Sequence, residues 1–165
     1  MISHEEIARK IYYFADNNKA AELAELAKSA KLSAIDFRKS DLIDGFSPLQ
    51  TNKQYSMEIY KILLGAGLDI NFQSSEGYTP ISSVAYYGYP EIVEYFANAG
   101  ARVDIVDNEG NTALHAGVRS KNPQVIKFLA QKFPELKKVK CKQGLTPLQV
   151  AQDLKLPENL LSLLR

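Results

Sequence analysis

The residue with the clearest chemical potential in this sequence is its single cysteine, Cys141, which stands between Lys140 and Lys142. Neighbouring ammonium groups favour the thiolate, which is the nucleophile in cysteine chemistry. The segment has the composition of a hairpin, so we expect the thiol to be exposed. A catalytic cysteine also needs a base held next to it, and the sequence places no histidine or carboxylate beside Cys141. We therefore expect no catalysis at this residue.

Other catalytic and metal-binding patterns are also missing. Two histidines and one cysteine supply too few nitrogen and sulfur ligands for an ordinary structural zinc site. We expect the nine glycines to lie at repeat turns and helix stops, and they form no phosphate-binding loop. Two acidic pairs, Glu5-Glu6 and Glu22/Glu25, lie on expected amphipathic helices, where carboxylates ordinarily face solvent. The sequence thus predicts a protein that is not an enzyme and uses no metal, cofactor or small-molecule substrate.

Length and composition indicate one globular domain. The chain has 165 residues, of which 45% are hydrophobic and 24% are charged. A single cysteine excludes a disulfide-stapled secreted scaffold. The chain begins with acidic residues where a signal peptide has a basic and an apolar region, and no apolar run approaches the ~20 residues that span a bilayer. We expect a cytoplasmic domain that is monomeric on its own and makes no membrane contact.

A short segment recurs four times and organises most of the chain. The copies read Asp-Gly-Phe-Ser-Pro-Leu from residue 44, Glu-Gly-Tyr-Thr-Pro-Ile from 76, Glu-Gly-Asn-Thr-Ala-Leu from 109 and Gln-Gly-Leu-Thr-Pro-Leu from 143. Their glycines are 32, 33 and 34 residues apart. About a dozen residues after each copy, apolar residues recur at helical spacing, usually behind a proline. This pattern predicts that each unit consists of a turn, a short helix, a second turn and a longer helix. We expect the Thr-Pro segment to cap the short helix, because the hydroxyl accepts a hydrogen bond from a free amide and proline favours the helical φ.

The glycine-turn pattern, the period of about 33 residues and the closing segment Gly67-Leu-Asp69-Ile-Asn71 resemble the ankyrin repeat. The resemblance covers residues 44–165 and implies an all-α solenoid of stacked helix-turn-helix units with hairpin-like turns. We divide the chain into an N-terminal capping repeat at 1–43, repeats at 44–75, 76–108 and 109–142, and a C-terminal capping repeat at 143–165. The last repeat ends where a second helix would end, so we expect a complete domain.

Two copies depart from the family pattern. The first has Asn52-Lys53 where the family has a pair of alanines, and it is one residue short. We therefore expect its first helix to be irregular. The third copy replaces the glycine stop of the longer helix by Lys132-Phe133-Pro134. There we expect Phe133 to pack and Pro134 to end the helix.

One position of the pattern carries a histidine, His115, in the third copy only. The family uses this histidine to hydrogen-bond neighbouring turns, so the resemblance implies a structural role. Gln50, Ser82 and Gln149 stand at the same position in the other copies. We expect the hydrogen bonds between turns to differ there.

The resemblance also implies a binding surface, because partners of ankyrin repeat proteins bind along the concave side formed by turn tips and first helices. Carried over position by position, it gives these candidate partner-binding residues: Phe46, Tyr55, Glu76, Tyr78, Tyr86, Tyr87, Glu109, Asn111, Arg119, Lys140 and Lys142. Residues 78–89 hold four of the nine tyrosines, and tyrosine is enriched at binding hot spots. We expect Tyr78, Tyr86 and Tyr87 to face outward and Tyr89 to cover neighbouring helices. The alternative is that all these rings only cover helices.

The total charge of +1 hides an uneven distribution. Residues 1–43 carry seven basic and seven acidic side chains, residues 44–110 carry three and nine, and residues 111–165 carry ten and three. A stacked solenoid should therefore have an acidic middle and a basic C-terminal part, with four lysines gathered within residues 137–142. Such a gradient would steer a partner with complementary patches. For any single lysine, a solvated loop is the simpler interpretation.

We interpret the chain as a non-enzymatic protein–protein interaction module, an adaptor, scaffold or inhibitor that binds one or more folded proteins through its concave surface and turn tips. An alternative is a dedicated inhibitor, such as an immunity protein that neutralises a cognate toxin or enzyme. Binding of nucleic acid or an anionic surface through residues 137–142 is less favoured. That segment lacks interleaved aromatic residues, and the acidic middle would repel phosphate.

Overall fold

The computed structural model describes residues 4–29, 47–50 and 52–165. These residues form α-helices and two short 3-10 helices, with no β-strand among them. The elements, in chain order, are α1 (His4–Asp16), α2 (Ala20–Ser29), η3 (Pro48–Gln50), α3 (Met57–Gly65), α4 (Pro80–Tyr87), α5 (Pro90–Asn98), α6 (Ala113–Ser120), α7 (Pro123–Lys132), η4 (Pro134–Lys138), α8 (Pro147–Asp153) and α9 (Glu158–Leu164).

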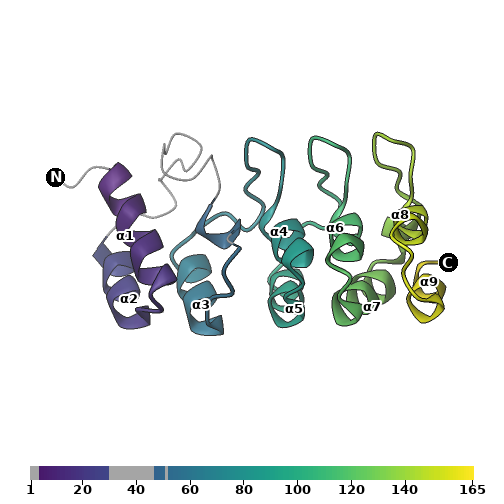
Figure 1. Ribbon diagram of the computed structural model, residues 1–165. Helices are drawn as coiled ribbons and strands as arrows, with labels where there is room; N and C mark the ends of the chain where they lie inside the picture. The colour runs from purple at the N-terminus through teal and green to yellow at the C-terminus, as the bar shows by residue number, and fades with distance from the viewer. Residues whose placement is uncertain (1–3, 30–46, 51) are drawn as a thin grey trace.

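Successive helix pairs stack side by side into an elongated solenoid, with the two termini at opposite ends (Figure 1). One row holds the first helices of the repeats, α4, α6 and α8, and the other row holds α3, α5, α7 and α9. Hairpin-like turns project together from one side, before α4, α6 and α8. The prediction of an all-α solenoid with such turns is confirmed.

Capping residues explain where the helices begin. Thr79 precedes α4, and its side chain accepts a hydrogen bond from the amide of Ser82, while Pro80 occupies the first helical position. Thr146 accepts from the amide of Gln149 in the same way before α8. The predicted capping by the Thr-Pro segment is confirmed in these two repeats.

The apolar positions of the longer helices form the continuous core between the rows. Ile59, Ile92, Val93, Ile126 and Leu129 are each at most 2% exposed, and burying one such side chain contributes about 1.5–3 kcal/mol. No single repeat encloses these side chains, because each helix pair buries them against the next pair. Stacking is therefore the main source of stability.

Both expected irregularities are present. In the first copy the first helix is reduced to η3, a single 3-10 turn. In the third copy α7 ends at Lys132, and η4 begins at Pro134. Phe133 between them is half-buried, with its ring centroid 6.5 Å from that of Phe128. The predictions for Phe133 and Pro134 are confirmed.

Candidate binding surface

The turns before α4, α6 and α8 share one hydrogen-bonding pattern. In the turn before α6, the amide of Asp107 donates to the carbonyl oxygen of Asn111 at 3.0 Å, and the amide of Gly110 donates to that of Asp107 at 2.9 Å. Equivalent bonds close the turns at residues 74–78 and 141–145. Each turn is therefore a compact hairpin with a fixed shape.

Backbone hydrogen bonds also join neighbouring hairpins. The amide of Asn108 donates to the carbonyl oxygen of Glu76 at 3.0 Å, and the amide of Lys142 donates to that of Glu109 at 2.8 Å. The Asn108 side chain adds a 2.9 Å bond to the carbonyl oxygen of Ser75. The hairpin tips therefore form one connected edge that presents their side chains in a fixed order.

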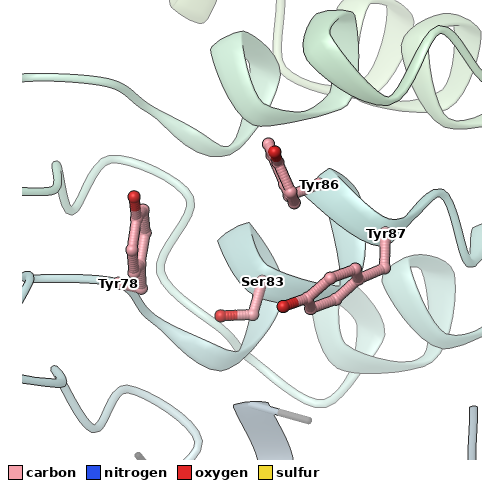
Figure 2. A pocket seen from close by; sticks show the side chains of 4 residues that line it. All are labelled: Tyr78, Ser83, Tyr86 and Tyr87. Atoms are coloured by element: carbon pink, nitrogen blue, oxygen red, sulfur yellow. The ribbon is translucent and has the colours of Figure 1, made fainter. Parts of the chain in front are cut away.

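Three tyrosines gather where the first of these hairpins meets α4, and we call Tyr78, Tyr86 and Tyr87 the tyrosine cluster. Their exposed fractions are 38%, 52% and 42%. Together with Ser83 they line an open hollow of about 190 Å³. Figure 2 shows Ser83 between Tyr78 on one side and Tyr87 on the other. The predicted outward position of the three tyrosines is confirmed.

Two rings of the cluster contact each other, and one of them also stacks on a half-buried tyrosine. Tyr86 and Tyr87 meet nearly edge to face, with centroids 5.5 Å apart and planes at 82°. Tyr87 stacks on Tyr89 at 6.1 Å, and the Tyr89 hydroxyl donates to the carbonyl oxygen of Asn52 at 2.7 Å. Tyr89 is half-buried, as expected of a ring that covers its neighbours. These contacts hold Tyr87 in place, so a partner would meet a surface that is already ordered.

The electrostatic surroundings of Tyr78 are mostly acidic. Partial burial raises the pKa of its hydroxyl above the usual value, and the charges of Asp107 and Glu76 raise it further, while Arg119 acts in the opposite direction. Glu76 and Glu109 are exposed at the hairpin tips. Glu109 also accepts a 3.1 Å hydrogen bond from the side chain of Gln143.

Two candidate residues prove to be structural, and their expected exposure is wrong. Tyr55 is only 6% exposed, and its hydroxyl donates to Asp16 at the end of α1 at 2.9 Å. Asn111 is 9% exposed, and its side-chain amide donates to the carboxylate of Asp107 at 3.0 Å. Tyr55 thus joins the N-terminal helix pair to the first repeat, and Asn111 holds its own hairpin.

The other candidate residues lie on the hairpins, on α6 or outside the described part of the chain. Arg119, exposed on α6, donates to the side-chain oxygen of Asn111 at 3.2 Å. Lys140 and Lys142 are exposed on the hairpin before α8, away from the tyrosine cluster. Phe46 lies outside the described residues.

Ser83 is the residue of the hollow that the sequence interpretation did not single out. It is only 5% exposed. Its position four residues before Tyr87 puts both side chains on one face of α4. That spacing is a signal in the sequence from which its place in the hollow could have been inferred.

The residues considered for chemistry have structural surroundings. Cys141 is only 5% exposed, and its thiol donates to the side-chain oxygen of Gln143 at 3.0 Å. The expectation of an exposed thiol is therefore wrong, because the hairpin turns this side chain inward. His115 is fully buried and bonds to Thr112 and to the carbonyl oxygen of Leu145, which confirms its structural role.

Neither a metal-binding cluster nor a membrane-spanning helix is found among the described residues. No group of three or more histidine, cysteine, aspartate or glutamate side chains in that part of the chain is arranged to hold a metal ion. None of its helices has the length and apolar character needed to cross a bilayer.

Stacked helix pairs with aligned hairpins define a repeat solenoid whose units are about 33 residues long. The chain belongs to the ankyrin repeat family, since the family model described as "Ankyrin repeats (3 copies)" matches residues 49–140. The match covers more than half of the chain, and it includes the tyrosine cluster and the hairpins before α4 and α6.

Several characterised proteins are similar to this chain over the repeats. A palmitoyltransferase, AKR1 of Lachancea kluyveri, is 30% identical over 57% of this chain and 13% of its own length. Human Rabankyrin-5 is 32% identical over 55% of the chain and 8% of its length. Chicken NF-kappa-B inhibitor alpha is 28% identical over 50% of the chain and 26% of its length. The chain spans about a quarter or less of each relative, so their whole activities do not transfer to it.

Proposed function

We propose that this protein binds a folded protein partner through the concave side of its hairpin edge, with the tyrosine cluster at the centre of the contact. Three half-exposed tyrosines around one hollow carry this proposal. Tyrosine offers a large, rigid contact area with a polar end, and hot spots of binding concentrate in such residues. Membership of the ankyrin repeat family supports a role in protein–protein interaction.

The ordering of the cluster supports the same proposal. Tyr87 is held by stacking on Tyr89, and the hairpin that carries Tyr78 is bonded to the next hairpin. A surface that is ordered before binding loses little conformational entropy on association. Glu76, Glu109, Lys140 and Lys142 lie on the hairpins, and Arg119 lies on α6 with a hydrogen bond to the hairpin residue Asn111. In this proposal these five residues serve as a polar rim.

Whether the protein acts as an adaptor or as a dedicated inhibitor depends on how many partners it has. An adaptor binds several proteins with modest affinity, whereas an inhibitor such as an immunity protein binds one enzyme or toxin tightly and abolishes its activity. One of the relatives is named an inhibitor, NF-kappa-B inhibitor alpha. We include a cytoplasmic location in the proposal, because the single cysteine is a free thiol.

Affinity capture with the tagged full chain, followed by mass spectrometry, tests the proposal. The Tyr86→Ala, Tyr87→Ala double variant serves as the parallel bait, with circular dichroism as a check on its fold. We expect at least one protein to be captured by the wild type and lost with the double variant. Capture of the same proteins in equal amounts by both baits would contradict a central role for the tyrosine cluster.

A further inference from the structure

The hollow of the tyrosine cluster has the size of one long side chain. Its volume of about 190 Å³ is below the roughly 300–1,000 Å³ of a pocket for a drug-sized ligand. It is open to solvent, and the three tyrosines that line it are exposed, so a side chain projecting from another protein can enter it. A single residue of a partner is therefore a better occupant than a free small molecule.

The walls of the hollow combine aromatic faces with hydroxyl groups. Tyr78, Tyr86 and Tyr87 supply the rings, and Ser83 supplies a hydroxyl between them. Among the described residues, none hydrogen-bonds the hydroxyls of Ser83, Tyr86 or Tyr87. The negative faces of aromatic rings attract cations, and hydroxyl oxygens accept hydrogen bonds from them.

Charge in and around the hollow favours a cation as well. Glu76 and Asp107 carry the carboxylates that act on Tyr78, and Arg119 is the opposing charge. The guanidinium of Arg119 is bonded to Asn111 on the next hairpin. Residues 44–110, which contain the whole cluster, hold nine acidic and three basic side chains. The electrostatic potential at Tyr78, on one side of the hollow, is therefore negative.

We propose that the tyrosine cluster binds an arginine side chain presented by the partner protein. This inference rests on the proposed function and names the chemistry of its central contact. The planar guanidinium stacks on aromatic faces and donates to several acceptors at once, whereas a lysine ammonium is a point charge with a stronger hydration shell. Ser83, Tyr86 and Tyr87 supply hydroxyl acceptors, and Glu76 supplies the long-range attraction.

A pair of short peptides tests the occupant without knowledge of the partner. The probe is an acetylated and amidated peptide, Ser-Gly-Ala-Arg-Ala-Gly-Ser, and its control carries citrulline, which has the same shape but no charge, in place of arginine. Binding to the full chain is followed by NMR from the amide signals of residues 78–88. We expect saturable shifts with a dissociation constant in the millimolar range and at least about fivefold weaker binding of the citrulline peptide.

Variants of the protein separate the contributions of the aromatic rings and of the nearby charges to peptide binding. Tyr86→Ala with Tyr87→Ala should abolish the shifts, and Glu76→Gln should weaken binding about two- to threefold because it removes one nearby negative charge. Glu94→Gln, an exposed change on α5 in the other row of helices, is the matched control and should have no effect. Removal of the opposing charge by Arg119→Gln should strengthen binding.

Equal binding of the two peptides, shifts located outside the cluster, or no shifts at all would each overturn the inference. If that happened while the double tyrosine variant still lost its captured protein, the arginine would be wrong and the proposed function would stand. If both baits captured the same proteins, the proposed function would fail, whatever the peptides showed.

Discussion

At the scale of single residues, two different side chains join successive repeats in the same way. His115 accepts a hydrogen bond at Nδ1 from the amide of Thr112 at 3.2 Å, so its Nε2 carries the proton and donates to the carbonyl oxygen of Leu145 at 3.1 Å. A neutral imidazole thus supplies one acceptor and one donor. The acceptor, Nδ1, makes a hydrogen bond within the same repeat, and the donor, Nε2, makes a hydrogen bond to the next hairpin.

Gln50 makes the equivalent pair of bonds in the first copy. Its side-chain oxygen accepts from the amide of Ser47 at 2.8 Å, and its nitrogen donates to the carbonyl oxygen of Tyr78. The expectation that the turn-to-turn bond differs at Gln50 is therefore wrong. It is right for Ser82, whose shorter side chain accepts from the amide of Thr79 and donates to its carbonyl oxygen, both within its own turn.

The buried, neutral imidazole of His115 predicts how the stability of the fold depends on pH. Burial lowers the pKa of His115, so below about pH 6.5 the unfolded chain binds a proton that the folded chain binds less readily. Stability should fall as the pH drops through the interval between the two pKa values, by up to about 1.4 kcal/mol per pH unit. His115→Gln should fold at pH 7.5, because glutamine can make the same pair of hydrogen bonds, and its stability should lack the part of the pH dependence that comes from His115. Urea unfolding between about pH 5 and pH 7.5 measures the free energy of unfolding of the wild type and of His115→Gln. The same dependence of this free energy on pH in both proteins would contradict the lowered pKa of His115.

At the scale of elements, the hairpins depend on glycine for two separate reasons. Gly77 and Gly144 have positive φ angles of 81° and 78°. A Cβ atom at Gly77 would lie 2.8 Å from the backbone nitrogen of Asn108 in the next hairpin, whereas at Gly144 it would meet nothing within 4 Å. The first glycine permits both the turn and the close approach of hairpins, and the second permits only the turn.

The two alanine variants should therefore differ in stability. Gly144→Ala should cost roughly 1–2 kcal/mol, from the left-handed backbone alone. Gly77→Ala should cost at least about 1 kcal/mol more, because neighbouring hairpins must separate. Chemical denaturation of both variants measures the difference. Equal losses would show that the contact between the hairpins contributes nothing to the role of Gly77.

At the scale of the whole molecule, the stack turns the charge distribution along the sequence into a charge gradient in space. The acidic stretch of the sequence, residues 44–110, precedes the stretch 111–165, which has ten basic side chains. The described residues of the first stretch lie in the middle of the solenoid, and residues 111–165 form its C-terminal part (Figure 1). Lys140 and Lys142 are exposed there. The same +1 total could describe an evenly mixed surface, which would exert no steering force.

The gradient predicts that the association rate with the captured partner falls as salt is added. Stopped-flow mixing at about 50 and 300 mM sodium chloride should show a decrease of at least about threefold, because exposed charges are screened over these concentrations. Lys140→Gln with Lys142→Gln should reduce the salt dependence if the basic part contributes to steering. A rate constant that does not change with salt would contradict steering.

The repeat period and the capping residues predicted the order and the starts of the helices, because these features are local in the sequence. The resemblance to the ankyrin repeat implied the solenoid and the outward positions of Tyr78, Tyr86 and Tyr87. Tyr55 was misplaced because its partner, Asp16, lies 39 residues earlier in a helix pair that lacks the repeat pattern. Asn111 was misplaced although its partner Asp107 is only four residues away, so that spacing could have indicated a hairpin bond. The inward turn of Cys141 depends on the hairpin conformation, which the residue types alone do not specify.

The most direct test of the central claim is the dissociation constant of the captured partner for three proteins: the wild type, the Tyr86→Ala, Tyr87→Ala variant and Tyr13→Ala. Tyr13, on α1, is 54% exposed and lies outside the cluster, so it is the matched control. Isothermal titration calorimetry should show about 30-fold weaker binding by the double variant, equivalent to about 2 kcal/mol, and unchanged binding by Tyr13→Ala. Equal affinities for all three proteins would contradict the claim that the tyrosine cluster is the centre of the binding surface.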